Sequence, residues 1–195
     1  QFWIGFLDAL GIEARRIEFS SDSSEDQARQ FGKGRGTVDC CYPVKCISGH
    51  YGELLARDRH HKIDVLLSPM VYSLPSYLNG HVLASLACPR VMAAPENIKA
   101  GFLKEKDVFA EHGVRYAAPL VSLADAPLVP KQLYEGLRDA IPGLTPEETK
   151  RAAQAGFAAL EAYAAGLRKQ ARAVLAQCAR EDKPALLVLA RPYHM

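Results

Sequence analysis

The stretch KIDVLLSPMVY, residues 62–72, says most about the fold. Val65, Leu66 and Leu67 form an apolar run that is rich in β-branched and aliphatic side chains and is bounded by Pro69. A short run of this kind is typical of a strand that is buried on both faces of a parallel sheet. We therefore predict a central strand here and expect neighbouring elements to be arranged around it.

Helix-like and strand-like patterns alternate on both sides of this run. The predicted strands are residues 12–19, 37–43, 62–72, 88–95 and 114–123, and the predicted helices are residues 2–10, 44–61 and 97–113. Gly11 and Gly113 follow two of the helices, where a glycine ends a helix most easily. This alternation predicts an α/β fold with a parallel, Rossmann-like or flavodoxin-like sheet. Functional loops are then expected at the carboxyl ends of the strands.

The pattern becomes helical after about residue 130. Thr145, Pro146 and Glu148 form a capping box that opens a helix, which we expect to end near Arg180. Apolar residues in this helix step by three and four positions: Phe157, Leu160, Ala164, Leu167, Ala171, Val174 and Cys178. This heptad seam favours packing against another helix of the same protein, with a dimeric coiled coil as the alternative.

These changes of pattern divide the sequence into three parts. Residues 1–128 are predicted to form the α/β domain, residues 129–182 a helical segment with one long helix, and residues 183–195 the first strand of a further α/β domain. We therefore interpret the chain as a piece of a longer protein, whose other domains are expected partners.

Composition excludes several classes of partner. The net charge of +2 creates no strong field, so we expect neither nucleic acid nor an acidic membrane as a partner. No apolar run approaches the ~18 residues that cross a bilayer. The five cysteines are an odd number and are unevenly spread, which favours a reducing, cytoplasmic location over a secreted disulfide framework.

Three of these cysteines lie in CCYPVKCISGH, residues 40–50. If a helix begins near Tyr42, Cys41 lies at its N-terminus, where unpaired N–H groups favour a thiolate. Cys46 then lies about 140° around the helix from Cys41. Cys41 is thus a candidate metal ligand or reactive thiol, with simple packing as the alternative, whereas Cys40 and Cys46 are expected to be structural. A redox pair with Cys46 is a weaker hypothesis.

The remaining candidates carry less specific signals. Cys88 precedes Pro89 and becomes a ligand candidate if it lies at the same sheet edge as Cys41. Cys178 is expected in the core, and the pair His60-His61 at a helix C-terminus. No C-x₂-C pair indicates zinc. GKGRGT, residues 32–37, lacks the order of a P-loop, so it is either a basic loop near a phosphate or a plain surface loop.

Four stretches together resemble the large acyl-CoA dehydratase activase-related proteins, which are relatives of the activator and iron–sulfur components of (R)-2-hydroxyglutaryl-CoA dehydratase. The stretches are DCCYPVKCISGHYGELL, LLSPMVYSLPS, CPRVMAAPENIKAGF and LVLARPYHM. The C-x-P-x-K motif of that family corresponds to Cys41, Pro43 and Lys45, its later Cys-Pro to Cys88-Pro89, and its R-P-Y-H ending to residues 191–194. The match follows the same order through nearly the whole chain.

The resemblance implies a domain that helps to bind a [4Fe–4S] cluster and takes part in low-potential electron transfer toward acyl-CoA chemistry. Cys41 and Cys88 are the implied ligands, Lys45 supplies nearby positive charge, and an acyl-CoA dehydratase-type protein is the implied partner. A cluster usually needs four ligands, so others must come from elsewhere. No segment resembles the family's ATP-hydrolysing modules. The competing hypothesis is a non-catalytic scaffold that docks other domains.

Overall fold

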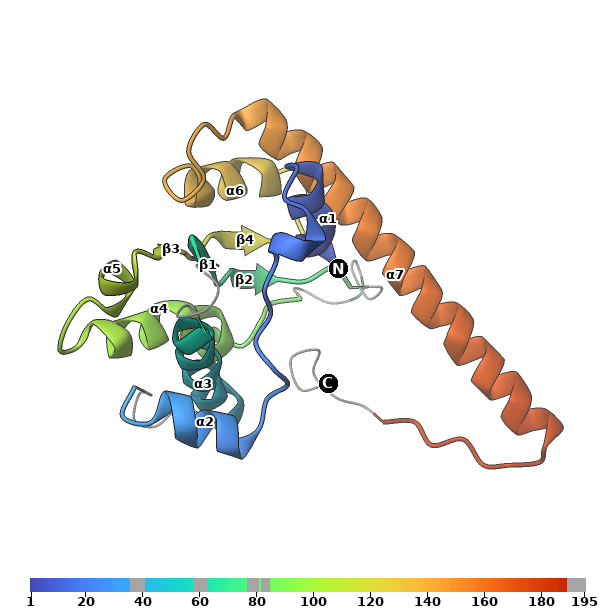
Figure 1. Ribbon diagram of the computed structural model, residues 1–195. Coiled ribbons are helices and arrows are strands. Elements are labelled where there is room, and N and C mark those ends of the chain that lie inside the picture. The colour runs from blue at the N-terminus through green and yellow to red at the C-terminus, as the bar shows by residue number, and fades with distance from the viewer. Residues whose placement is uncertain (36–40, 58–62, 77–80, 82–84, 189–195) are drawn as a thin grey trace. The chain divides into compact units, whose positions relative to one another are not determined.

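The computed structural model describes residues 1–35, 41–57, 63–76, 81 and 85–188. The helices are α1 (Phe2–Ala9), α2 (Glu25–Gly32), α3 (Tyr42–Arg57), α4 (Pro89–Leu103), α5 (Val108–His112), α6 (Val129–Leu137) and α7 (Pro146–Arg180). The strands are β1 (Val65–Leu67), β2 (Met70–Ser73), β3 (Arg115–Ala117) and β4 (Leu120–Ser122). The protein is thus mixed α/β, with small parallel sheets and one long C-terminal helix (Figure 1).

The predicted central strand is confirmed, but a proline divides it. β1 pairs in parallel with β3, and β2 pairs in parallel with β4, with Val65 opposite Arg115 and Met70 opposite Leu120. The shared register places Pro69 opposite Pro119. Because proline has no N–H to donate, regular pairing stops there. The amides of Ser68 and Met70 still bond to the carbonyls of Ala117 and Pro119, at 2.8 and 2.9 Å.

Residues 15–150 form one compact unit around these strands. In Figure 1, α6 lies on one side of the strands and α3, α4 and α5 on the other. The core on the second side consists of Tyr51, Leu55, Leu66, Ile98, Phe102, Val108, Phe109 and Val114. Val121 of β4 and Leu133 and Leu137 of α6 are fully buried on the first side. This layering agrees with the predicted α/β class, and the finer Rossmann-like or flavodoxin-like assignment stays a prediction.

Three of the five strands predicted within residues 1–128 are wrong where the structure describes them. Residues 12–19 form a loop with a 3₁₀ turn at Ala14–Arg16. Most of their side chains are exposed, so the alternation of apolar and polar residues does not correspond to a buried and an exposed face of a sheet. Residues 89–95 belong to α4, because Pro89 suits the first turn of a helix. Tyr42 and Pro43 likewise begin α3, and residues 37–40 lie outside the described part. Residues 183–188 form no strand, and residues 189–195 are not described.

Residues 1–14 and 151–195 form the second unit. Phe2 of α1 contacts Phe157 of α7, with ring centroids 5.0 Å apart, and Phe6 is fully buried. The first part of the predicted heptad seam therefore packs against another helix of the same chain. The capping box is confirmed, because the Thr145 hydroxyl accepts from the Glu148 amide at 3.2 Å and the Glu148 carboxylate accepts from the Thr145 amide at 3.0 Å. The predicted division at residues 128 and 182 stays a prediction.

None of the helices described here combines the length and apolar character that crossing a membrane requires.

Candidate functional site

Cys41 lies immediately before α3, as the sequence predicted. Its carbonyl oxygen accepts hydrogen bonds from the amides of Val44 and Lys45, at 3.0 and 3.2 Å, so it is the capping residue of the helix. Its side chain is a free thiol and is exposed.

Cys88 occupies the equivalent position on α4. It is the N-cap residue, Pro89 follows at the first helical position, and the Met92 amide bonds to the Cys88 carbonyl at 2.9 Å. The preceding residue, Ala87, donates its amide to the carbonyl of Tyr72 at 2.9 Å, which ties this cap to the end of β2. The thiol is partly buried.

The two family-motif cysteines thus share one structural context, a thiol at the start of a helix that packs on the parallel strands. Lys45 is exposed on the first turn of α3, four residues after Cys41 and on the same side of the helix. Within the described ranges, no group of three or more His, Cys, Asp and Glu side chains is arranged to hold a metal ion. A metal centre that used both cysteines would need further ligands from outside those ranges.

The other cysteines and histidines have more ordinary surroundings. Cys46 is buried on α3, as predicted, with 4% of its surface exposed. Cys178 is only partly buried on α7, so its predicted core position is wrong. Cys40, His60 and His61 lie outside the described residues, and so do Gly36 and Thr37 of the basic loop.

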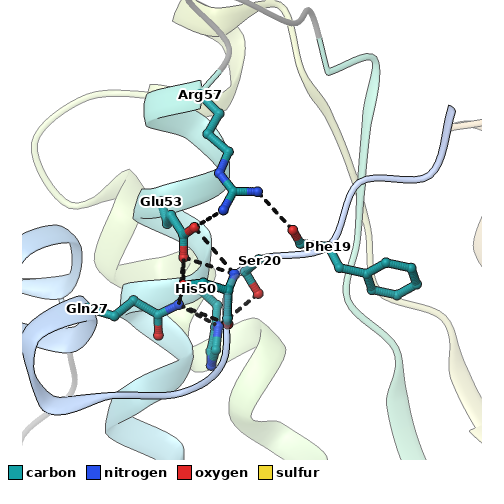
Figure 2. Close-up of polar contacts among 7 residues, drawn as sticks. Phe19, Ser20, Gln27, His50, Glu53 and Arg57 are labelled. Carbon is teal, nitrogen blue, oxygen red and sulfur yellow. Dashed lines mark hydrogen bonds and ion pairs between the residues drawn. The ribbon is translucent and has the colours of Figure 1, made fainter. Parts of the chain in front are cut away.

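A polar cluster on the middle of α3 was not predicted, and we call it the serine–histidine cluster (Figure 2). It joins Ser20, Ser21 and Ser23 of one loop to Gln27, His50, Glu53 and Arg57. The His50 ring lies between two serines, with Nδ1 2.8 Å from Ser20 Oγ and Nε2 2.9 Å from Ser23 Oγ. A sequence signal existed, because His50, Glu53 and Arg57 recur at helical spacing on one face.

Gln27 links the histidine of the cluster to its glutamate. Its amide Nε2, which can only donate, lies 3.1 Å from His50 Nδ1 and 2.6 Å from Glu53 Oε2. Nδ1 also lies 2.8 Å from Ser20 Oγ, so the ring contacts Gln27, Ser20 and Ser23 together. These contacts fasten the serine loop to α3.

Glu53 is the buried charge of the cluster, with 6% of its surface exposed. Its carboxylate accepts from the Ser21 amide and hydroxyl, from Gln27 and from Arg57. Burial alone would raise the pKa of Glu53, but these hydrogen bonds and the charge of Arg57 outweigh it and hold the pKa below its ordinary value. Arg57 also donates to the Phe19 carbonyl at 2.9 Å, which extends the attachment of the loop.

Burial lowers the pKa of His50 below its ordinary value, and the nearby Glu53 carboxylate only partly offsets this effect. The unfolded chain then binds more protons than the folded chain, so the contribution of His50 to stability is present above about pH 6.5 and is lost as the pH falls through the folded pKa. We expect an NMR titration to place the His50 midpoint below the ordinary histidine value of about 6.5. A midpoint at or above that value would contradict this cause.

A second polar group lies where β1 ends. The Tyr51 hydroxyl donates to Ser68 Oγ and lies 3.1 Å from the Tyr116 hydroxyl, and Lys99 Nζ is 4.9 Å from the centre of the Tyr116 ring. Burial raises the pKa of both tyrosines, so both hydroxyls remain protonated at neutral pH. These contacts attach α3 and α4 to the ends of β1 and β3. They thereby orient the two helices that begin at Cys41 and Cys88.

Comparison with known proteins supplies the family. The chain matches the family described as CoA enzyme activase uncharacterised domain (DUF2229), over residues 1–195. Searches of curated proteins and of solved structures each gave no match. Since the match covers the full length given, this chain belongs to the CoA enzyme activase domain family, as the resemblance of its cysteine motifs predicted.

Proposed function

We propose that this chain is a domain of an activase-related protein that contributes the thiolates of Cys41 and Cys88 to a [4Fe–4S] cluster. A cluster held in this way would carry low-potential electrons toward an acyl-CoA dehydratase-type partner in the cytoplasm. The observation that supports the proposal is the common position of the two motif cysteines, each at the N-terminal cap of a helix. Thiolates are the usual ligands of such clusters.

The contacts of α3 and β2 support the proposal that Cys41 and Cys88 lie at the same edge of the parallel strands. The Tyr51 hydroxyl meets Ser68 at the end of β1, and Cys41 lies ten residues before Tyr51, roughly 15 Å along the helix at ~1.5 Å per residue. From Ser68 to the end of β2 the chain runs for about five residues, which is a comparable distance at ~3.3 Å per residue. Cys88 follows that strand end through the pairing of Ala87 with Tyr72.

The residues present fit half of a cluster. Two cysteines supply two of the usual four thiolates, so the remaining ligands would come from a partner or from residues outside the described ranges. Lys45 would supply positive charge near Cys41 and so near the anionic cluster. The cluster itself, when bound, would supply one-electron redox chemistry.

Anaerobic reconstitution with iron and sulfide tests this proposal. We expect the wild-type chain, reconstituted alone and with a dehydratase-type partner, to bind iron and acid-labile sulfide. Cys41→Ala and Cys88→Ala should each lower bound iron by more than about half, because loss of a thiolate ligand exposes a cluster to decay. Cys178→Ala on α7 is the matched control and should keep the wild-type iron content.

Equal iron content in all three variants would refute the assignment of ligands. An iron-free wild-type chain under both conditions would instead favour the second candidate, a non-catalytic docking domain. The observation behind that second candidate is that the described residues provide no third ligand. Circular dichroism of each variant separates loss of a ligand from loss of fold.

A further inference from the structure

The second half of α7 exposes a continuous apolar stripe. We define the α7 stripe as Ala164, Leu167, Ala171, Val174, Leu175 and Cys178. At about 100° per residue these positions cover an arc of roughly 100° on one side of the helix. Leu167, Val174 and Leu175 are 48%, 57% and 58% exposed, whereas the first half of the same helix is covered by α1.

Charge is distributed unevenly around this stripe. Residues 161–180 contain four basic side chains, Arg168, Lys169, Arg172 and Arg180, against the acid Glu161. Arg168, its ion-pair partner Glu161 and Arg172 border one edge of the stripe, and uncharged Gln170 and Gln177 border the other. Lys169 lies on the opposite side of the helix from the centre of the stripe. The surface is therefore apolar in the middle and basic along one edge.

We propose that the α7 stripe docks an amphipathic helix of a partner, with aliphatic residues facing the stripe and a carboxylate facing Arg172. The alternating steps of three and four residues are the spacing that a helix presents to another helix. Ala164 and Ala171 allow close approach of the two backbones. The basic edge selects an acidic partner, because like charges across such an interface are repelled.

The same observations disfavour two other occupants. A second copy of this chain would bring another basic edge, and its Glu161 already pairs with Arg168 of its own helix at 2.8 Å. An anionic membrane would suit the basic residues, but helices that bind membranes present large side chains such as Trp, Phe and Leu. Half of the α7 stripe is small, namely Ala164, Ala171 and Cys178. The proposal is independent of iron binding.

The test measures binding of the full chain to two synthetic helical peptides. Both have leucine at the heptad core positions, and one has glutamate where the other has lysine at the flanking positions. We expect the glutamate peptide to bind at least about tenfold more tightly at low salt. Arg172→Glu should remove that preference, and Lys169→Glu, with the same change of charge on the opposite side, should keep it. Leu167→Asp should weaken binding at least about tenfold.

Several results would overturn the proposal. These are equal affinity for the two peptides, binding of neither, or an equal effect of Arg172→Glu and Lys169→Glu. A wild-type chain that sediments as a dimer, which Leu167→Asp converts to a monomer, would assign the stripe to a second copy. Sedimentation with phosphatidylglycerol vesicles, without preference between the peptides, would assign it to a membrane. Circular dichroism verifies that each variant keeps its helix content.

Discussion

Replacing Gly49 with alanine is expected to destabilise the protein by about 2–3 kcal/mol, although glycine-to-alanine changes usually stabilise helices. Gly49 lies where α3 crosses α2. A Cβ atom there would lie 2.8 Å from Ala28 Cα and 3.0 Å from the Gln27 carbonyl oxygen. Both are backbone atoms, so no rotamer change can relieve the overlap and α2 must move away. That movement would also strain the contacts of Gln27 with His50 and Glu53.

Gly166→Ala on α7 is the matched control, because nothing lies within 4 Å of a Cβ atom built at that position. Here the ordinary propensity applies, and the change should stabilise the helix by about 0.5–1 kcal/mol. Urea denaturation followed by circular dichroism measures both variants. The two changes are expected to act in opposite directions, and a stabilised Gly49→Ala protein would show that the helices do not cross as closely as described.

The sequence does not predict this close crossing of α2 and α3, but it does predict several of the helices and strands. Residues 44–61 and 145–180 were predicted as helices because long amphipathic periods and a capping box are local signals. The apolar runs at residues 62–72 and 114–123 were predicted as strands for the same reason. Their pairing in parallel was predicted only through the α/β alternation, and their division at Pro69 and Pro119 depends on tertiary register.

The errors have local causes too. In the segment beginning with Cys88-Pro89, proline suits either a strand edge or the first turn of a helix, and only packing against the core decides between them. The site shows the same limit. Cys41 was predicted at a helix start from its own neighbourhood, whereas the serine–histidine cluster joins residues about 30 positions apart. The loop around Ser21 has no periodicity that would reveal such a contact.

Glu53→Ala is expected to cost about 2–4 kcal/mol, the largest loss we expect from removing one polar side chain. The change removes the acceptor for the Ser21 amide, the Gln27 amide and Arg57 together. Gln27 is the most affected, because its side chain is buried and it loses its shortest hydrogen bond, at 2.6 Å, and keeps those to the Ser21 carbonyl and hydroxyl at 3.2 and 3.1 Å. Hydrogen bonds to a charged group are the stronger ones, so their joint loss is costly. Glu53→Gln should cost less, because its amide oxygen still accepts.

The charge on Glu53 adds a dependence on pH whose sign follows from its lowered pKa. The folded chain releases this proton more readily than the unfolded chain, so the stabilisation is complete above the ordinary glutamate pKa of about 4.3 and is lost as the pH falls through the folded value. The difference in unfolding free energy between wild type and Glu53→Ala should therefore shrink on acidification. Glu135→Ala, which removes an exposed pair with Lys131, should change stability by less than about 0.5 kcal/mol at any pH. If Glu53→Ala and Glu135→Ala lower the free energy of unfolding equally, the serine–histidine cluster does not hold the loop to α3. Glu53 is buried and accepts from several donors, so a working cluster requires its loss to cost more than the loss of an exposed ion pair.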